Sequence, residues 1–122
     1  MSTISASTTS TTAFKITTDT TGALVFQTGA TPTTAVTLDA SQNMGLGVTP
    51  SAWTTNYRAF QLKNNAAISN YSGTDSIELT SNAYAYADNA WKYIETYSAS
   101  RYTVGAGSHR SEEHTSELQS LR

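Results

Sequence analysis

The scarcity of large aliphatic side chains is the feature that most limits what this chain can fold into. Residues 1–109 contain only 17 Leu, Ile, Val and Phe residues, which is below the roughly 20% typical of chains that build a core easily. A high net charge would then indicate disorder, but the formal net charge of the full chain is only −2. Two alternatives remain open: partial disorder, or a small domain that completes its core against other chains.

Short β-prone runs separated by turn residues predict the fold class. The expected strands are residues 14–17, 23–28, 35–40, 44–48, 58–62, 66–69 and 76–80. Within 35–40, Val36 and Leu38 alternate with Thr37 and Asp39, which is the two-residue period of a strand. No helical period runs through these segments, so we predict an all-β protein of short antiparallel strands and turns.

A β-hairpin is predicted in the Tyr-rich part of the chain. NAYAYA (82–87) and WKYIETY (91–97) flank Asp88-Asn89, a pair that tolerates the positive φ of tight hairpin turns. A helix is the competing interpretation for 91–97, because Trp91 and Ile94 are three residues apart. The flanking turns and the density of aromatic residues favour the strand.

Composition argues against several classes of partner and cofactor. The chain has no cysteine, so it has no disulfide framework and no thiolate metal site; we expect neither metal nor cofactor. The basic residues before residue 110 are scattered rather than clustered, which argues against nucleic-acid binding. No apolar run approaches the roughly 20 residues of a membrane helix, so we expect no membrane insertion. The Ser/Thr-rich start, residues 1–12, is an expected flexible lead-in and lacks the pattern of a signal peptide.

Aromatic residues provide the most interesting candidate site. The set expected to bind carbohydrate is Tyr84, Tyr86, Trp91, Tyr93 and Tyr97. Aromatic faces stack on sugar rings, but the same residues could equally form the hydrophobic body of the sheet or a contact between chains. The residue types alone favour the second, structural role.

Four carboxylates and one glycine pair are further candidates, for a catalytic site and a phosphate-binding loop respectively. Asp75, Glu78, Asp88 and Glu95 could in principle supply the two acids of a glycosidase, but Asp in a predicted turn is expected for turn geometry alone. Gly45-Leu46-Gly47 lacks the remaining features of a phosphate-binding loop; two small positions within a strand fit a close backbone approach better. The chain is therefore expected not to be an enzyme.

The segment RSEEHTSELQS, residues 110–120, stands apart from the charge-poor chain before it. All eleven residues match, in order, the translation of a common short-read sequencing adapter. This resemblance implies that residues 110–122 are a non-native tail, that any helix there is artefactual, and that the native chain continues differently after about His109. His114 and its acidic neighbours are therefore set aside as a catalytic cluster.

Residues 19–53 resemble a stretch found in bacteriophage tail fibre and related virion structural proteins. The resemblance rests on TGALVFQTG (21–29) and on AVTLDASQNMGLGV (35–48) followed by TPSAW. It combines a strand ending in Leu38-Asp39, a turn with Asn43, and the apolar-Gly alternation of 44–48. Residues 57–104 are also similar to material that follows this motif in such chains, so the resemblance spans about residues 13–104.

The resemblance implies a fibrous, homotrimeric β-structured component of a virion, assembled in the bacterial host cytoplasm and located on the phage tail. It divides the chain into a lead-in (1–12), a fibre-type β-repeat segment (13–50), a Tyr-rich β segment (51–109) and the non-native tail (110–122). The expected function is structural support of host adsorption, with other tail proteins and a host surface glycan as further partners. A carbohydrate-binding β module is the alternative, and a tail-spike glycosidase is the third hypothesis.

Overall fold

The computed structural model describes residues 20–63, 65–105 and 107–114, and these residues are all β-structure, turns and loops without a helix. The all-β prediction is therefore confirmed for this part of the chain. The strands are β1 (Leu24–Thr28), β2 (Thr33–Leu38), β3 (Met44–Leu46), β4 (Tyr57–Leu62), β5 (Ala66–Tyr71), β6 (Ser76–Ser81), β7 (Ala83–Ala87), β8 (Ala90–Tyr93), β9 (Ala99–Gly105) and β10 (Ser108–His114).

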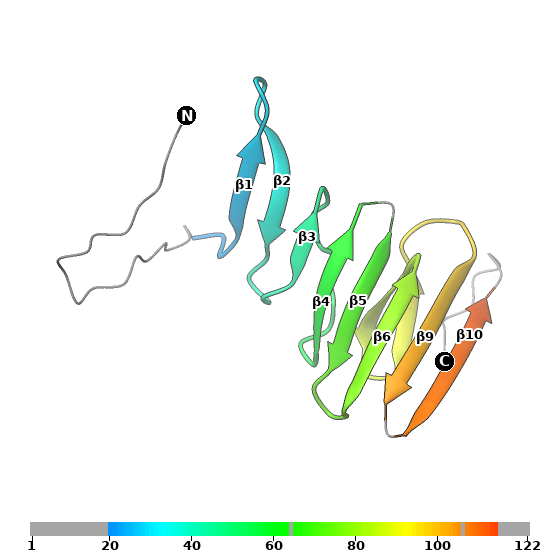
Figure 1. Ribbon diagram of the computed structural model, residues 1–122. Coiled ribbons are helices and arrows are strands. Elements are labelled where there is room, and N and C mark those ends of the chain that lie inside the picture. The colour runs from blue at the N-terminus through cyan, green and yellow to red at the C-terminus, as the bar shows by residue number, and fades with distance from the viewer. Residues whose placement is uncertain (1–19, 64, 106, 115–122) are drawn as a thin grey trace, which may run out of the picture.

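One large sheet and one hairpin make up the described fold. The sheet has the order β1-β2-β3-β4-β5-β6-β9-β10, so its strands lie beside each other nearly in chain order (Figure 1). All its neighbours are antiparallel except β3 and β4, which are parallel. The β7–β8 hairpin is inserted between β6 and β9 and lies behind the sheet in Figure 1. The hairpin therefore covers one face of the sheet, which we call the hairpin face; the opposite one is the open face.

The hairpin forms where the sequence predicts it. β7 and β8 pair antiparallel, and Asn89 in the turn has a φ of 56°, as a tight hairpin turn requires. β8 is shorter than expected, because it ends at Tyr93 and residues 94–97 follow as a loop. The buried amide of Asn82 holds this loop: its Nδ2 donates to the carbonyls of Glu95 (3.0 Å) and Tyr97 (2.7 Å). The competing helix at 91–97 is not formed.

Six of the other expected strands are present as β1 to β6, and the expected strand at 14–17 lies outside the described residues. β9 and β10 are not among the strands expected from the sequence. Residues 110–114 of the adapter-like segment continue β10, which pairs with β9 along seven residues, so the described part of that segment is a strand. That residues 110–122 are a non-native tail stays a prediction.

The turn between β2 and β3 is built around Asp39 and Asn43. The Asp39 carboxylate accepts hydrogen bonds from the Asn43 backbone N–H (2.8 Å) and from its side-chain amide (3.0 Å). The Asn43 Oδ1 in turn accepts from the backbone N–H of Ala59 on β4 (3.0 Å). Because Asn43 is buried and uses both ends of its amide, this turn aligns β2, β3 and β4.

The chain passes from β3 to the parallel strand β4 across the hairpin face. A Cβ added at Gly45 would lie 2.0 Å from the Val48 carbonyl oxygen, so only glycine fits under this crossover. The close backbone approach at Gly45 is to the chain itself, and an approach of glycines 45 and 47 around a trimer axis stays a prediction. The buried Gln61 Oε1 holds the crossover by accepting from the Ser51 backbone N–H (2.9 Å) and the Trp53 indole N–H (3.3 Å).

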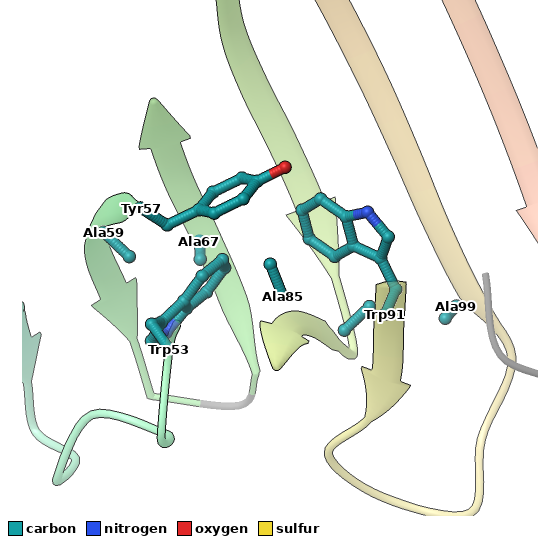
Figure 2. Packing of buried hydrophobic residues seen from close by; sticks show 8 residues of the cluster. Trp53, Tyr57, Ala59, Ala67, Ala85, Trp91 and Ala99 are labelled. Carbon is teal, nitrogen blue, oxygen red and sulfur yellow. The ribbon is translucent and has the colours of Figure 1, made fainter. Parts of the chain in front are cut away.

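The core between the hairpin and the sheet consists of aromatic rings surrounded by alanines (Figure 2). Trp91 of β8 is fully buried and meets Trp53 edge-on, with ring centroids 6.0 Å apart and planes at 90°. Its contact with Tyr57 is similar, at 5.6 Å and 84°, and both are favourable aromatic geometries. The buried alanines are Ala59, Ala67, Ala83, Ala85 and Ala99. Their small side chains leave the space that the three large rings fill.

Most of the large aliphatic side chains of the sheet lie on the open face instead. On β6, Ser76, Glu78 and Thr80 are buried, whereas Ile77 and Leu79 are exposed. The same alternation is seen on β5, where Ala67 and Ser69 are buried and Ile68 is exposed. This inverts the usual arrangement of a one-sided sheet, in which the polar face meets water.

We expect Trp91→Ala to lower the free energy of unfolding by about 3–5 kcal/mol, because it removes the largest buried side chain and leaves a cavity. Tyr97→Ala is the control, since Tyr97 is 71% exposed and exposed substitutions change stability by about 0.5 kcal/mol or less. Urea unfolding followed by circular dichroism measures the free energy of unfolding of both variants. Tryptophan fluorescence gives a second measurement for Tyr97→Ala, which keeps Trp91. Equal losses in the two variants would contradict this assignment of the core.

Candidate functional site

A cavity of about 280 Å³ lies on the hairpin face, beside the aromatic core, and we call it the hairpin pocket. It is lined by residues from β4, β5, β6 and β9, from the hairpin turn and from the start of β10: Tyr57, Tyr71, Thr74, Ser76, Glu78, Asn89, Arg101, Thr103, Gly105, Ser108 and Arg110. Strands far apart in the sequence therefore contribute to one site.

Strand register places the pocket side chains. Tyr57 and Tyr71 are directly paired on β4 and β5, and their ring centroids are 5.1 Å apart. Glu78 of β6 pairs with Thr103 of β9. Since cross-strand partners point to the same face, these residues converge on the hairpin face. The aromatic pair forms one wall of the pocket and the strand pair another.

Glu78 and Arg101 are the two buried charged residues of the pocket lining, and Arg110 is an exposed third one. The Glu78 side chain is 7% exposed, and its Oε1 lies 4.0 Å from Arg101 Nη1. Arg101 Nη2 donates to Glu112 Oε2 at 2.5 Å, and the guanidinium lies over the Trp91 ring at 4.8 Å from the centroid. Arg101 is thus held between a carboxylate on each neighbouring strand and an aromatic face.

Burial raises the pKa values of two groups that line the pocket, Glu78 and Tyr57. Desolvation raises the pKa of Glu78 above its ordinary value, and the Glu112 carboxylate adds to the rise while Arg101 opposes it. Desolvation, with a contribution from Glu78, also raises the pKa of Tyr57 to about 12. The phenol therefore stays neutral at physiological pH.

Several buried polar atoms under the hairpin have no hydrogen-bond partner within the described residues. They are Ser69 Oγ, Glu78 Oε2, Thr80 Oγ1, Trp91 Nε1 and Arg101 Nε. Such atoms are uncommon in folded proteins because each costs about 1–3 kcal/mol. Two of the five atoms, Glu78 Oε2 and Arg101 Nε, belong to residues that line the hairpin pocket.

The five aromatic residues predicted to bind carbohydrate do not form one platform. Trp91 is fully buried, and Tyr84 and Tyr93 are partly buried against the core. Tyr86 is 41% exposed with Lys92 Nζ over its ring at 4.3 Å, and Tyr97 is 71% exposed in the loop after β8. Trp91, Tyr84 and Tyr93 therefore pack in or against the core, whereas Tyr86 and Tyr97 lie outside it.

Of the four carboxylates considered as a glycosidase pair, only Glu78 lines the hairpin pocket. Asp75 lies in the turn before β6, and Glu95 is exposed in the loop after β8. Asp88, in the hairpin turn, accepts from Asn56 Nδ2 at 2.8 Å through both carboxylate oxygens. Asp88 therefore acts in fixing the hairpin turn to the segment before β4.

Tyr57, Tyr71 and Arg101 line the hairpin pocket but are not among the residues that the sequence singles out. Tyr57 and Tyr71 meet through the pairing of β4 with β5, and Arg101 comes beside Glu78 only because β6 pairs with β9 across the inserted hairpin. One signal was available: Glu78 alternates with Ile77 and Leu79 in a strand-like run. That pattern placed the carboxylate and the aliphatics on opposite faces without showing which face is covered.

A second candidate surface is the open face. One row of directly paired residues crosses seven strands from β1 to β9: Leu24, Leu38, Met44, Phe60, Ile68, Leu79 and Tyr102. The exposed large apolar residues on this face are Phe26, Met44, Leu46, Ile68, Ile77, Leu79, Tyr102 and Val104, each 38–56% exposed. We call this set, with its partly buried neighbours, the apolar row surface.

Comparison with known protein families, with curated proteins and with solved structures finds no match for this chain. Within the described ranges, no helix is long and apolar enough to span a membrane. In the same part of the chain, no three His, Asp or Glu side chains are grouped so that they could hold a metal ion.

We expect the Glu78 carboxyl to make stability depend on pH in a defined direction. Its pKa is raised on folding, so between the ordinary value of about 4.5 and the raised value the folded state binds more protons than the unfolded state. Glu78 therefore makes the free energy of unfolding fall as the pH rises through this window and level off above it.

Urea unfolding at a series of pH values measures this effect for the wild type and for Glu78→Gln. The difference between their free energies of unfolding should fall with rising pH in the predicted window. Glu95→Gln makes the same chemical change at an exposed position and should keep the wild-type slope. An unchanged pH dependence in Glu78→Gln would contradict the assignment.

Proposed function

We propose that this chain is a structural component of a bacteriophage tail fibre or a related virion appendage, and that it assembles as a homotrimer through the apolar row surface. The proposal combines two lines of support. The first is the resemblance of residues 13–104 to such proteins, which implies trimeric assembly. The second, and the one observation that carries it, is the continuous exposed apolar face of the large sheet.

The apolar row surface is large for a monomer. Eight big side chains, each 38–56% exposed, present on the order of 600 Å² of side-chain surface. The largest apolar patch of a typical monomer is roughly 300–600 Å². Partly buried neighbours extend this surface: Leu24, Val36, Leu38, Phe60 and Leu62. Together they approach the roughly 800 Å² per partner of a stable protein interface.

The chemistry of this face favours copies of the same chain as its occupants. The row from Leu24 to Tyr102 contains no charged side chain, so identical rows can meet without burying an unpaired charge. Packing the aliphatics of three chains together supplies the core that each chain lacks alone.

In this proposal the chain acts by assembly and adsorption, and not by catalysis. It would hold a recognition region away from the particle, together with other tail proteins, on a virion that forms in the bacterial host cytoplasm. A glycosidase needs two carboxylates across a cleft, and the four acids considered for that role are spread over separate turns and strands. No observation favours the enzymatic alternative.

We expect Leu79→Lys to disrupt the assembly, because it places a charge in the middle of the apolar row surface. Assembly would bury this surface, and an unpaired buried charge is strongly unfavourable. Val25→Lys is a matched control. Val25 and Leu79 are both 47% exposed, but Val25 pairs with Thr37 on the hairpin-face side of the sheet. Both variants carry the same new charge.

Sedimentation-velocity ultracentrifugation gives the mass of each species. The wild type and Val25→Lys should sediment as trimers of the 13.0 kDa chain, and Leu79→Lys as a monomer or an aggregate. A monomeric wild type, or equal loss of assembly in both variants, would overturn the proposal. A dimeric wild type would confirm the interface and overturn the trimer.

A further inference from the structure

We infer that the trimer axis runs across the strands of the large sheet, along the row from Leu24 to Tyr102, so that each strand forms one layer with its own copies. This inference rests on the proposed homotrimer and adds the orientation of the chains and the residues that meet. Three features of the open face support it: the shape of its apolar surface, the length of the strands and the position of a charge.

The apolar row surface is long across the strands and narrow along them. The row crosses seven strands, which lie side by side in Figure 1 and span about 29 Å at roughly 4.8 Å between neighbours. Along each strand the surface is only about 7 Å deep, because each strand adds one apolar neighbour two positions away from its row residue. These neighbours are Phe26, Val36, Leu46, Leu62, Ala66, Ile77 and Val104.

This shape favours an axis along the row. With that axis, all seven strands pack their apolar residues against other copies. An axis along the strands would instead reduce the apolar contact to one thin layer, and most of the exposed aliphatic surface would stay in water.

The length of the strands fits three sheets around an axis along the row. β4, β5 and β6 each have six residues and are therefore about 20 Å long. In a triangle with sides of about 20 Å, the centre lies about 6 Å from each side, close to the roughly 5 Å that side chains bridge when sheets pack about 10 Å apart. With the strands along the axis, the sides would be about 29 Å and the centre about 8 Å away, which aliphatic side chains do not reach.

The layers formed in this way are apolar. The β6 layer combines three copies of Ile77 and Leu79, and the β9 layer combines three copies of Tyr102 and Val104. All four residues are exposed in the single chain. Each of these layers can therefore bury its side chains without enclosing an unpaired charge.

Arg58 is a charged residue of the open face, and it lies at the rim of this arrangement. It alternates with the buried Tyr57 on β4. Its guanidinium donates to the carbonyls of Thr55 (2.8 Å) and Tyr57 (2.7 Å), at the start of β4. The apolar residues of this strand, Phe60 and Leu62, belong to its other half. The charge therefore lies toward a corner of the triangle and away from its axis.

Cysteine cross-linking of the 122-residue chain tests the inference, since the chain has no cysteine of its own. The double variant Met44→Cys/Leu79→Cys places one thiol on β3 and one on β6, at exposed positions of the row. These strands are three apart in the sheet, about 14 Å, so the two thiols of one chain cannot form a disulfide. Trypsin cleaves after Arg58, Lys63 and Lys92, which separates the two positions onto different peptides.

We expect oxidation to produce two symmetric disulfides, one between two copies of position 44 and one between two copies of position 79, each identified by mass spectrometry of the peptides. Face-to-face packing in opposite directions gives at most one symmetric link, because only one strand can then lie opposite itself. A disulfide between positions 44 and 79, or the absence of either symmetric link, would overturn the inference. Val25→Cys, on the hairpin-face side, is the control and should not cross-link; equal cross-linking there would indicate random collision and also overturn it.

Sedimentation velocity separates the failure of this inference from that of the proposed assembly. A trimer linked between positions 44 and 79 would overturn the orientation of the axis and leave the homotrimer intact, whereas a monomeric wild type would overturn both. If the double variant does not assemble, isotope-filtered NOE spectra of mixed labelled and unlabelled wild type decide the outcome. The Leu79 methyl groups should contact Leu79, Ile68 or Tyr102 of another chain, and contacts with Leu24 or Leu38 instead would overturn the inference.

Discussion

The edge-on packing of Trp91 against Trp53 and Tyr57 is the constraint on which the rest of the structure depends. Three large rings fit between a two-stranded hairpin and a sheet only if the surrounding side chains are small, and the five alanines of the core meet that requirement. Because one face of the sheet must then carry Ala, Ser and Thr, the aliphatic residues of the same strands occupy the other face. A chain with few aliphatics thus covers the alanine side of its sheet and leaves the aliphatic side open.

The sequence predicted the strands well and the covered face poorly, for a physical reason. Turn residues and the two-residue period locate strands locally, as at Asp88-Asn89 and in residues 35–40. The period shows that Ile77 and Leu79 oppose Glu78, but it contains no information on which side another element covers. That depends on Trp91, which is distant in sequence. The strand at 99–105 was missed because its alternation of Arg101, Tyr102 and Thr103 lacks a clear apolar side.

The candidate site shows the same limit. Of the five aromatic residues considered for sugar binding, Trp91 is fully buried at the centre of the core. Arg101 could not be connected with Glu78 from the sequence, because β6 and β9 become neighbours only when the hairpin folds out of the sheet between them. Residue type therefore singled out Glu78 as a candidate, whereas its grouping with Tyr57, Tyr71 and Arg101 required the topology.

The buried pair of Glu78 and Arg101 is difficult to explain by stability alone. Replacing a buried ion pair by apolar residues is often neutral or stabilising, and the polar atoms left without partners add to the cost. A domain with so few aliphatic residues has little stability to spare. Glu78 also lies between Ile77 and Leu79 of the apolar row surface. Contacts that fix β6 on the open face would therefore fix the Glu78 carboxylate on the hairpin face, so one strand would link assembly to the geometry of the pocket.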